Sequence, residues 1–448
     1  MSFIDDCRKL IAIDSSPSTG TEAVADYLAK RCREIGLTVT THDETLNGVP
    51  QKNVIARWGD ADDRKEFMLL SHIDTVDPGP YGLWKKTEGN PFNASIYGQD
   101  LCGLGVQTGK LDILCKLEAI KRVLMEHSRF QKPFVLAATY GNHLGMAGAI
   151  KLIRRKMFHA DMACIGEPTG LSVADGGSGF AKLEISIPFS EEEKKYHREH
   201  DLMESSSTQS KMFRGTTMEK GSLANNAIIK LLEYLEKLPS GIAIMDIDGG
   251  VAHNVQPQSA FIEIDMVDTF KDGVIKKLLL IRDEILKLTE EFKKHPDENF
   301  VTPYSTVNLG RIFKQNNHIH LLGSCRLLPS VSSATYEGWL ESLGEACRHV
   351  GANFRILDYK RPFLTNKEAG ILKTSLVVQK ELFQKNQSTK VVRGTEASVF
   401  ERTGQIDCIV FGAGQIPEDY SAADESISIA DLEKSIEFYM RLIERVCL

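Results

Sequence analysis

The 448-residue sequence lacks the features of chains that bind nucleic acid, span membranes or fold around disulfides. Its formal net charge is -7 and its Lys and Arg residues are not clustered, so nothing favours nucleic-acid binding. No uninterrupted apolar run is long enough to span a bilayer. The nine cysteines are scattered, without the close pairs of a zinc ribbon or a disulfide-stapled domain. The first residues lack a basic segment followed by an apolar core, so we expect no secretory signal and a cytoplasmic location.

What the sequence does contain is an ordinary globular composition, with 42% hydrophobic and 26% charged residues. A chain of this length is too long for one compact core, and two or three domains are expected. The order of the sequence patterns predicts two domains, one inserted into the other. The first covers residues 1–178 and 365–448, and the inserted domain covers residues 179–364.

Residues 1–178 alternate between helical and strand-like patterns. Apolar residues at helical spacing predict a helix over residues 20–35 that ends at Gly36, a usual helix terminator. The strand-like runs at 67–71 and 161–165 are continuously apolar rather than alternating. That pattern is typical of sheet strands covered on both faces. The sequence therefore predicts a layered α/β domain.

The pattern changes after Gly179. Residues 180–187 alternate between polar and apolar, whereas residues 190–211 hold little that could form a core and are predicted to be a mobile loop. Further on, two strands followed by a helix occur twice, a weak internal repeat on element order alone. The C-terminal part returns to α/β character, with a strand at 407–411 and an amphipathic helix at 430–446. We therefore expect an inserted α+β domain that can contain a duplicated unit.

Two short motifs follow predicted strands and suit metal binding. In Ser71-His72-Ile73-Asp74, one imidazole nitrogen can bind a cation while the carboxylate fixes the ring or coordinates as well. Glu167 follows the run 161–165 in the same way, and Pro168 cannot continue a strand ladder. The alternatives are a polar pair that caps a loop and a loop carboxylate that faces water. Two such strand ends favour a shared crevice at one edge of the sheet.

The order of the motifs resembles that of the zinc-dependent amidohydrolase and exopeptidase family. This family includes acetylornithine deacetylase, succinyl-diaminopimelate desuccinylase, aminoacylase and carnosine-type dipeptidases. The shared motifs are a His-x-Asp at a strand end, a Gly-rich segment before a helix, a Gly-x-x-Gly-Ala helix start, a Gly-Glu-Pro-Thr and a C-terminal Phe-Gly-x-Gly. The resemblance covers essentially the whole chain. It implies a zinc-exopeptidase-like layered sheet domain with an inserted lid domain, and amide hydrolysis by two zinc ions.

Part of the family's metal site is kept. By this resemblance His72 matches a metal ligand, Asp74 the carboxylate that orients it, and Glu167 a second ligand of the same metal. His143 replaces a ligand glutamate and could still bind a metal. The set His72, His143 and Glu167 is of the His/His/Glu type that some catalytic zinc centres use. One zinc ion is therefore compatible with the sequence.

The rest of that site is replaced. Thr108 stands where the family has the aspartate that bridges both metals, Asn142 where it has the general base, and Ser421 where it has a ligand histidine. A neutral hydroxyl cannot replace a carboxylate shared by two dications, because their mutual repulsion needs anionic ligands between them. An amide side chain does not accept a proton at neutral pH. A two-zinc site is therefore not expected.

Two residues of the inserted domain resemble the family's substrate contacts. Asn254, in the segment 249–257, matches an Asn that contacts substrate, and Arg326 matches an arginine that grips a substrate carboxylate through paired hydrogen bonds. The alternatives are a plain hairpin turn at Asn254, where Gly and Asn supply positive φ, and a surface salt bridge at Arg326. The family's lid histidine has no counterpart near residues 215–219.

Two functions are compatible with this mixture. The first is a divergent family member that binds an amino-acid-like or peptide-like ligand without two-zinc hydrolysis, as a binding, regulatory or assembly protein with a protein partner. The second is an active single-metal amidohydrolase or dipeptidase that acts on N-acyl amino acids or small peptides. The resemblance allows a monomer or a homodimer.

Overall fold

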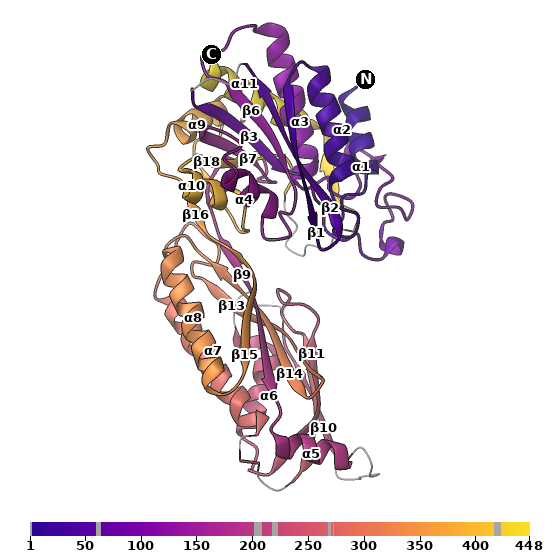
Figure 1. Cartoon of the computed structure of the whole chain (residues 1–448), viewed down its shortest axis with the longest axis vertical. Coiled ribbons are helices and arrows are strands. Elements are labelled where there is room, and N and C mark those ends of the chain that lie inside the picture. Colours follow the sequence, from indigo (N-terminus) through magenta and orange to yellow (C-terminus); the bar gives the residue numbers. More distant parts are fainter. Residues whose placement is uncertain are drawn as a thin grey trace. The chain divides into compact units, whose positions relative to one another are not determined.

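The computed structural model describes residues 2–59, 64–200, 208–216, 223–267, 270–271, 273–415 and 423–448. The chain forms two compact units (Figure 1). Residues 1–177 and 363–448 make up the first, here called the α/β unit, and residues 178–362 make up the inserted unit. Within the described parts of the chain, no helix combines the length and the apolar character needed to cross a membrane.

A mixed sheet forms the centre of the α/β unit. Its strand order is β1 (Thr38–Leu46), β2 (Val49–Trp58), β6 (Phe134–Thr139), β3 (Glu66–His72), β7 (Ala160–Gly166), β18 (Asp407–Phe411), β8 (Ala174–Gly177) and β16 (Phe363–Leu364), with β17 (Thr389–Val391) beside β8. The neighbours β6, β3, β7 and β18 run parallel. A small second sheet contains β19 (Ser426–Ser428), β5 (Asp100–Cys102) and β4 (Ser95–Tyr97), and a 3₁₀ turn lies at Tyr81–Leu83.

Helices cover both faces of the central sheet (Figure 1). On one face pack α1 (Phe3–Ala12), α2 (Glu22–Glu34), α3 (Gly109–Glu126), α9 (Gly370–Phe383) and α11 (Ile429–Cys447); on the other pack α4 (Ala147–Arg154) and α10 (Ala397–Gly404). In β3, Phe67 and Leu69 point into the first core, and Met68 and Leu70 into the second. The continuously apolar run therefore reflects burial on both sides, and the predicted layered α/β fold is confirmed.

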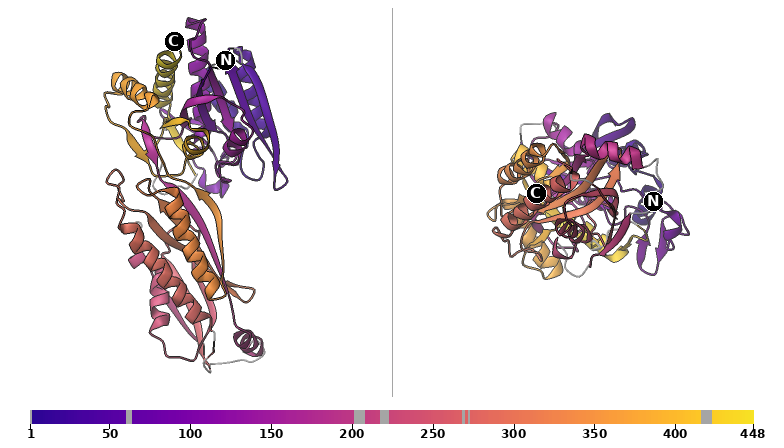
Figure 2. Two further views of the ribbon diagram at one scale, coloured as in Figure 1. Left: turned by 60° about the vertical axis from the view of Figure 1, so that its left-hand side comes forward. Right: turned by 90° about the horizontal axis from the view of Figure 1, so that it is seen from below.

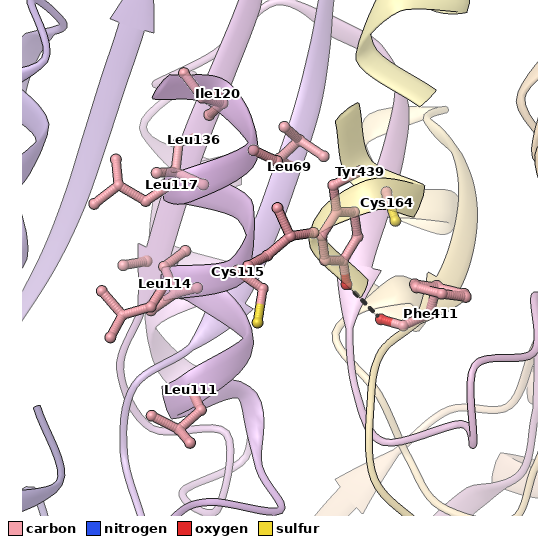
Figure 3. Close-up of a cluster of buried hydrophobic side chains, with 14 of the residues drawn as sticks. Leu69, Leu111, Leu114, Cys115, Leu117, Ile120, Leu136, Cys164, Phe411 and Tyr439 are labelled. Atoms are coloured by element: carbon pink, nitrogen blue, oxygen red, sulfur yellow. Dashed lines mark hydrogen bonds between the residues drawn. The ribbon is translucent and has the colours of Figure 1, made fainter. Parts of the chain in front are cut away.

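The core around α3 anchors the N-terminal end of this helix at the sheet edge (Figure 3). Leu114, Leu117 and Ile120 are almost fully buried there, and each such side chain contributes roughly 1.5–3 kcal/mol of burial free energy. Tyr439 of α11 lies against the same cluster, and its hydroxyl donates a hydrogen bond to the carbonyl oxygen of Phe411 (2.9 Å). Helix α3 and strand β18 are thereby held against the same part of the core.

The parallel register brings the ends of three strands to one edge of the sheet. His72 is the last residue of β3 and pairs with Thr139, the last residue of β6. Ser71 pairs with Gly166, the last residue of β7, and Glu167 follows directly. The two motifs that the sequence places after separate strands therefore lie at the same edge.

The inserted unit contains an antiparallel sheet with helices on one face (Figures 1 and 2). Its strand order is β10 (Gln209–Arg214), β12 (Ser259–Met266), β11 (Ile242–Gly250), β13 (Thr306–Gln315), β14 (His318–Leu327), β9 (Gly179–Pro188) and β15 (Asn353–Lys360). The covering helices are α6 (Ala227–Glu236), α7 (Val274–Lys293) and α8 (Ser333–His349), and a 3₁₀ turn lies at Leu223–Asn225. Pairs of strands precede both α7 and α8, in the element order expected from the sequence.

The prediction of a mobile loop over residues 190–211 was wrong for the part of this segment that the structure describes. Residues Glu191–His200 form helix α5, and β10 begins at Gln209. The carboxylate of Glu193 accepts the backbone N–H groups of Ser190 and Val274 (2.8 Å each), and the Ser190 hydroxyl accepts the N–H of Glu193 (3.2 Å). Capping of this kind stabilises a helix that has few apolar residues, and a hydrophobicity pattern does not detect it.

Candidate metal centre

His72 is the central residue of the strand-end cluster and is only 2% exposed. Its Nδ1 lies 3.4 Å from Oδ1 of Asp74, and its Nε2 lies 3.8 Å from Oε1 of Glu167. The backbone N–H of Gly109, at the start of α3, donates to the same Nε2 (3.3 Å). A Cβ at position 109 would lie 2.6 Å from the carbonyl oxygen of His72, so only glycine lets the helix begin this close.

The electrostatics of His72 follow from its carboxylate neighbours. Burial alone would lower the pKa of the imidazole. The hydrogen bond to Asp74 and the negative charges of Glu167 and Glu396 outweigh that effect and raise the pKa to about 9. The same contact and the charge of His143 hold the pKa of Asp74 well below its usual range, although burial opposes this. Asp74 therefore remains an anion that orients the His72 ring.

Asp74 also fixes the loop that follows β6. Its Oδ1 accepts the backbone N–H of Asn142 and its Oδ2 accepts that of His143, both at 3.1 Å. The rings of His72 and His143 meet edge to face, with centroids 5.5 Å apart. One ligand atom from each of His72, Asp74 and His143 lies within 4.8 Å of the others. Imidazole nitrogens and a carboxylate oxygen are ligands that zinc accepts in proteins.

Thr108 and Asn142 have local hydrogen-bond partners. Thr108 is the N-cap of α3, where its hydroxyl oxygen accepts the N–H of Lys110 (3.4 Å) and its O–H donates to the carbonyl of Gly105 (3.0 Å). The Asn142 amide donates to Oε1 of Glu167 (3.4 Å). Thr108 thus stabilises its own helix, and Asn142 offers N–H to the carboxylate beside it.

Comparison with known proteins gives the family of the chain. Residues 68–445 match the model of peptidase family M20/M25/M40. The chain belongs to this family. Among its sequence relatives, the acetylornithine deacetylase of Erwinia tasmaniensis is 27% identical over 292 residues, which are 58% of this chain and 73% of that protein. The acetylornithine deacetylase of Yersinia pseudotuberculosis is 28% identical over 235 residues, 49% of this chain and 58% of that protein.

Solved structures of M20 proteins share the fold. The aminoacylhistidine dipeptidase of Vibrio alginolyticus superimposes with a TM-score of 0.65 at 15% identity, covering 99% of this chain and 96% of that one. Human carnosine dipeptidase 1 gives a TM-score of 0.58 at 13% identity, covering 99% and 97%. The expected zinc-exopeptidase-like architecture is therefore confirmed. M20 proteins typically depend on metal, usually zinc, whereas the number of ions in this member stays a prediction.

The structure brings most of the predicted site residues of this M20 chain together. The close group contains His72 and His143 with Asp74, and Glu167 lies 3.8 Å from His72. The roles assigned to these residues remain predictions. Ser421, where the resemblance expects a ligand histidine in other members, lies outside the described residues.

One residue of the cluster was missed by the sequence interpretation. Glu396, directly before α10, is 1% exposed, and both of its carboxylate oxygens are buried with the Thr139 hydroxyl as a donor beside them. Burial, together with the charges of Asp74 and Glu167, raises its pKa to about 7, although the charge of His72 opposes the rise. The only sequence signal is an acidic residue in front of a helix, and nothing in its spacing connects position 396 with the motifs at 72 and 167.

Glu396 gives the M20 centre a testable pH dependence. Because its pKa rises from an ordinary 4.5 to about 7 on folding, its contribution to stability is full below pH 4.5 and is lost as the pH rises to about 7. We expect the melting temperature of Glu396→Gln, measured with a chelator, to exceed that of the wild type by a margin that widens from pH 5 to pH 8. A margin that stays constant over this range would contradict the buried, titrating carboxyl.

The predicted ligand contacts of the inserted unit are one loop residue and one strand residue. Asn254 is exposed in the connection between β11 and β12. Arg326 is an exposed residue of β14, and its side chain makes no ion pair or hydrogen bond with the described residues. The surface salt bridge considered as an alternative is therefore not seen there. Nearby in sequence, burial lowers the pKa of His253 to about 4, so this imidazole is neutral at physiological pH.

Proposed function

We propose that this M20 protein binds an amino-acid-like or peptide-like ligand at the sheet edge formed by the ends of β3, β6 and β7, without two-zinc amide hydrolysis. The observation that supports this most strongly is the hydrogen bond from the Asn142 amide to Glu167. An amide that donates to a carboxylate cannot also deprotonate an attacking water at neutral pH. The general base that hydrolysis needs is therefore missing from this position.

The donor set does not fit two divalent ions. Two such ions side by side repel each other and need an anionic oxygen between them. At the position expected to supply it, Thr108 offers a neutral hydroxyl that already donates to Gly105 and caps α3. Among the described residues, no other carboxylate joins the close group of His72, Asp74 and His143.

The same donors do fit a single zinc ion. His72, Asp74 and His143 converge within 4.8 Å, and Glu167 adds a second carboxylate beside His72. A zinc ion held there would act as a Lewis acid towards a carbonyl or carboxylate oxygen of the ligand. Nε2 of His72 lies 3.3 Å from the backbone nitrogen of Gly109, so metal binding at this atom has to displace that contact and release the proton that the raised pKa keeps on the ring. Asp74 fixes the ring orientation whether or not this happens.

The convergence of these ligand atoms also supports a second candidate function. In that proposal the chain is a single-metal amidohydrolase or dipeptidase that cleaves N-acyl amino acids or small peptides. Its sequence relatives include acetylornithine deacetylases, and its structural neighbours include dipeptidases. Loss of a general base typically costs about 10²–10⁴-fold in rate, which permits slow turnover.

One experiment separates the two functions. Protein purified without added zinc is analysed for metal content, then tested for binding and for hydrolysis with a panel of dipeptides and N-acetyl amino acids. We expect some of these compounds to raise the melting temperature of the protein and to be recovered without hydrolysis. Zinc-dependent hydrolysis that disappears in His72→Ala/Glu167→Ala would contradict the binding function and establish the enzyme. Sedimentation analysis of the same samples tests the proposed monomer or homodimer.

Arg326 provides a further test of ligand binding. We propose that it binds a carboxylate of the ligand and that Asn254 is a second polar contact. Hydrogen bonds to charged groups contribute about 1.5–3 kcal/mol, so Arg326→Ala should weaken the binding of a carboxylate ligand by about 10–150-fold in calorimetry. Arg355→Ala is the matched control, because Arg355 lies on the same sheet but is paired with Glu184. Equal affinities of the two variants would contradict the role of Arg326.

A further inference from the structure

Glu396 differs from other buried carboxylates of the α/β unit. Asp74 accepts two backbone N–H groups, Glu167 accepts the amide of Asn142, and one oxygen of Glu425 accepts the N–H of Gly105 (2.9 Å). Glu396 is as deeply buried as these residues, yet no backbone N–H of the described residues donates to it, and the side-chain donor beside it is the hydroxyl of Thr139. A buried carboxylate is costly unless a cation or several donors compensate it.

The local fold does not explain this residue. Glu396 precedes α10, but its side chain makes no capping hydrogen bond with that helix. The hydroxyl of Thr139 has a single proton, which the carbonyl oxygen of Ser71 (3.5 Å) and the carboxyl of Glu396 share. Glutamate is also not among the residues favoured at helix N-caps. Capping of α10 therefore does not explain why this carboxyl is buried.

The carboxyl interacts electrostatically with the strand-end cluster. Its strongest charged neighbours are His72, Asp74 and Glu167, and its negative charge in turn raises the pKa of His72. Three buried carboxyl groups are thus gathered around the imidazole of His72. Carboxyl groups therefore outnumber the imidazole that they surround, so a cation bound at this cluster would find negative charge to compensate it.

We propose that the centre takes one divalent cation, and that Glu396 supplies the negative charge that Thr108 and Asn142 do not provide. The inference rests on the single-ion fit under the proposed function. Because Glu396 lies outside the group whose ligand atoms converge within 4.8 Å, its role is to balance the charge of the ion and to support the ligand residues. Outer groups of this kind typically change metal affinity by about 10–100-fold.

Zinc titration of chelator-treated protein tests the proposal. Wild type is compared in calorimetry with Glu396→Gln, which keeps the size and removes the charge, and with Glu396→Asp, which keeps the charge. Glu425→Gln is the matched control. Glu425 is a second buried carboxyl, and burial raises its pKa to about 7. It accepts the backbone N–H groups of Gly105 and Gln107, which precede α3. Melting curves with a chelator check that each variant is folded.

We expect one zinc ion per wild-type chain, a dissociation constant about 10–100-fold higher for Glu396→Gln, a smaller change for Glu396→Asp, and an unchanged value for Glu425→Gln. Equal zinc affinity in Glu396→Gln and wild type overturns the inference. A wild type that binds no zinc also overturns the inference. The same holds if lysine methyl ester, used as an ammonium probe, binds in place of zinc and its affinity depends on Glu396. In those cases the ligand-binding function, tested on the peptide panel, still stands. Two zinc ions per chain would instead contradict the proposed function itself.

Discussion

Replacing Lys116 by methionine is expected to lower the free energy of unfolding of the α/β unit by about 3–5 kcal/mol. Lys116 is fully buried in α3, and its Nζ lies 2.7 Å from Oδ2 of Asp112. The same ammonium group donates to the carbonyl oxygen of Leu70 (2.6 Å) and to the hydroxyl of Ser71 (2.9 Å). Methionine fills a similar volume but leaves Asp112 as a buried charge without its cation.

The expected effect is large because Asp112 connects three strand ends. It accepts hydrogen bonds from Ser71 (2.7 Å) and from Tyr439 (2.6 Å), whose hydroxyl also reaches Phe411 at the end of β18. A Cβ on Gly166 would lie 1.9 Å from Oδ2 of Asp112, so glycine is needed at the end of β7 for this approach. Ser71 and Gly166 directly precede His72 and Glu167, so the same network supports the candidate metal centre.

Lys132→Met is the matched control. Lys132 forms an ion pair of similar length with Asp161 (2.6 Å), but the two side chains are 19% and 40% exposed, so the expected loss is about 1 kcal/mol or less. Denaturant unfolding can be followed by fluorescence in a Trp339→Phe background, in which the remaining tryptophans, Trp58 and Trp84, report on the α/β unit. Similar losses of unfolding free energy in both lysine variants would show that the buried network stabilises the fold no more than an exposed ion pair does.

Much of the fold could be predicted because burial leaves a direct pattern in the sequence. The apolar run at 67–71 indicates a strand covered on both sides, and β3 has cores on both faces. The amphipathic segment at 430–446 predicts a helix, and α11 covers it. The helix α5 was missed because polar capping holds it, and the pair Asp112 and Lys116, four residues apart, is indistinguishable in sequence from an exposed helical ion pair.

The candidate site was predictable where its residues belong to local motifs. His72, Asp74 and Glu167 follow strands, and the parallel register brings them together. Glu396 lies more than two hundred residues beyond Glu167 in the sequence, and only the position of α10 on the sheet brings it near His72. The capping role of Thr108 could have been expected from a threonine directly before a helix.

Restoring two acidic residues is expected to produce the largest functional change. In Thr108→Asp/Asn142→Glu, the first carboxylate can stand between two cations and the second can accept a proton from water that attacks an amide carbonyl. Aspartate caps helices as well as threonine does, so α3 should be preserved. A general base contributes about 10²–10⁴-fold, and we expect a gain of this order in the zinc-dependent hydrolysis of dipeptides or N-acetyl amino acids.

The isosteric variant Thr108→Asn/Asn142→Gln separates charge from shape in this experiment. It carries side chains of the same size as the acidic variant, but its amides neither bridge cations nor accept protons. It should stay at the wild-type rate, whereas the acidic variant should also take up more zinc because the new carboxylates reduce the repulsion between ions. If both variants hydrolyse the panel equally, or if the acidic variant gains zinc without activity, the replaced residues at 108 and 142 do not account for the proposed loss of hydrolysis. The loss would then have to lie in the ligand-binding residues, with Arg326→Ala as the next variant to compare.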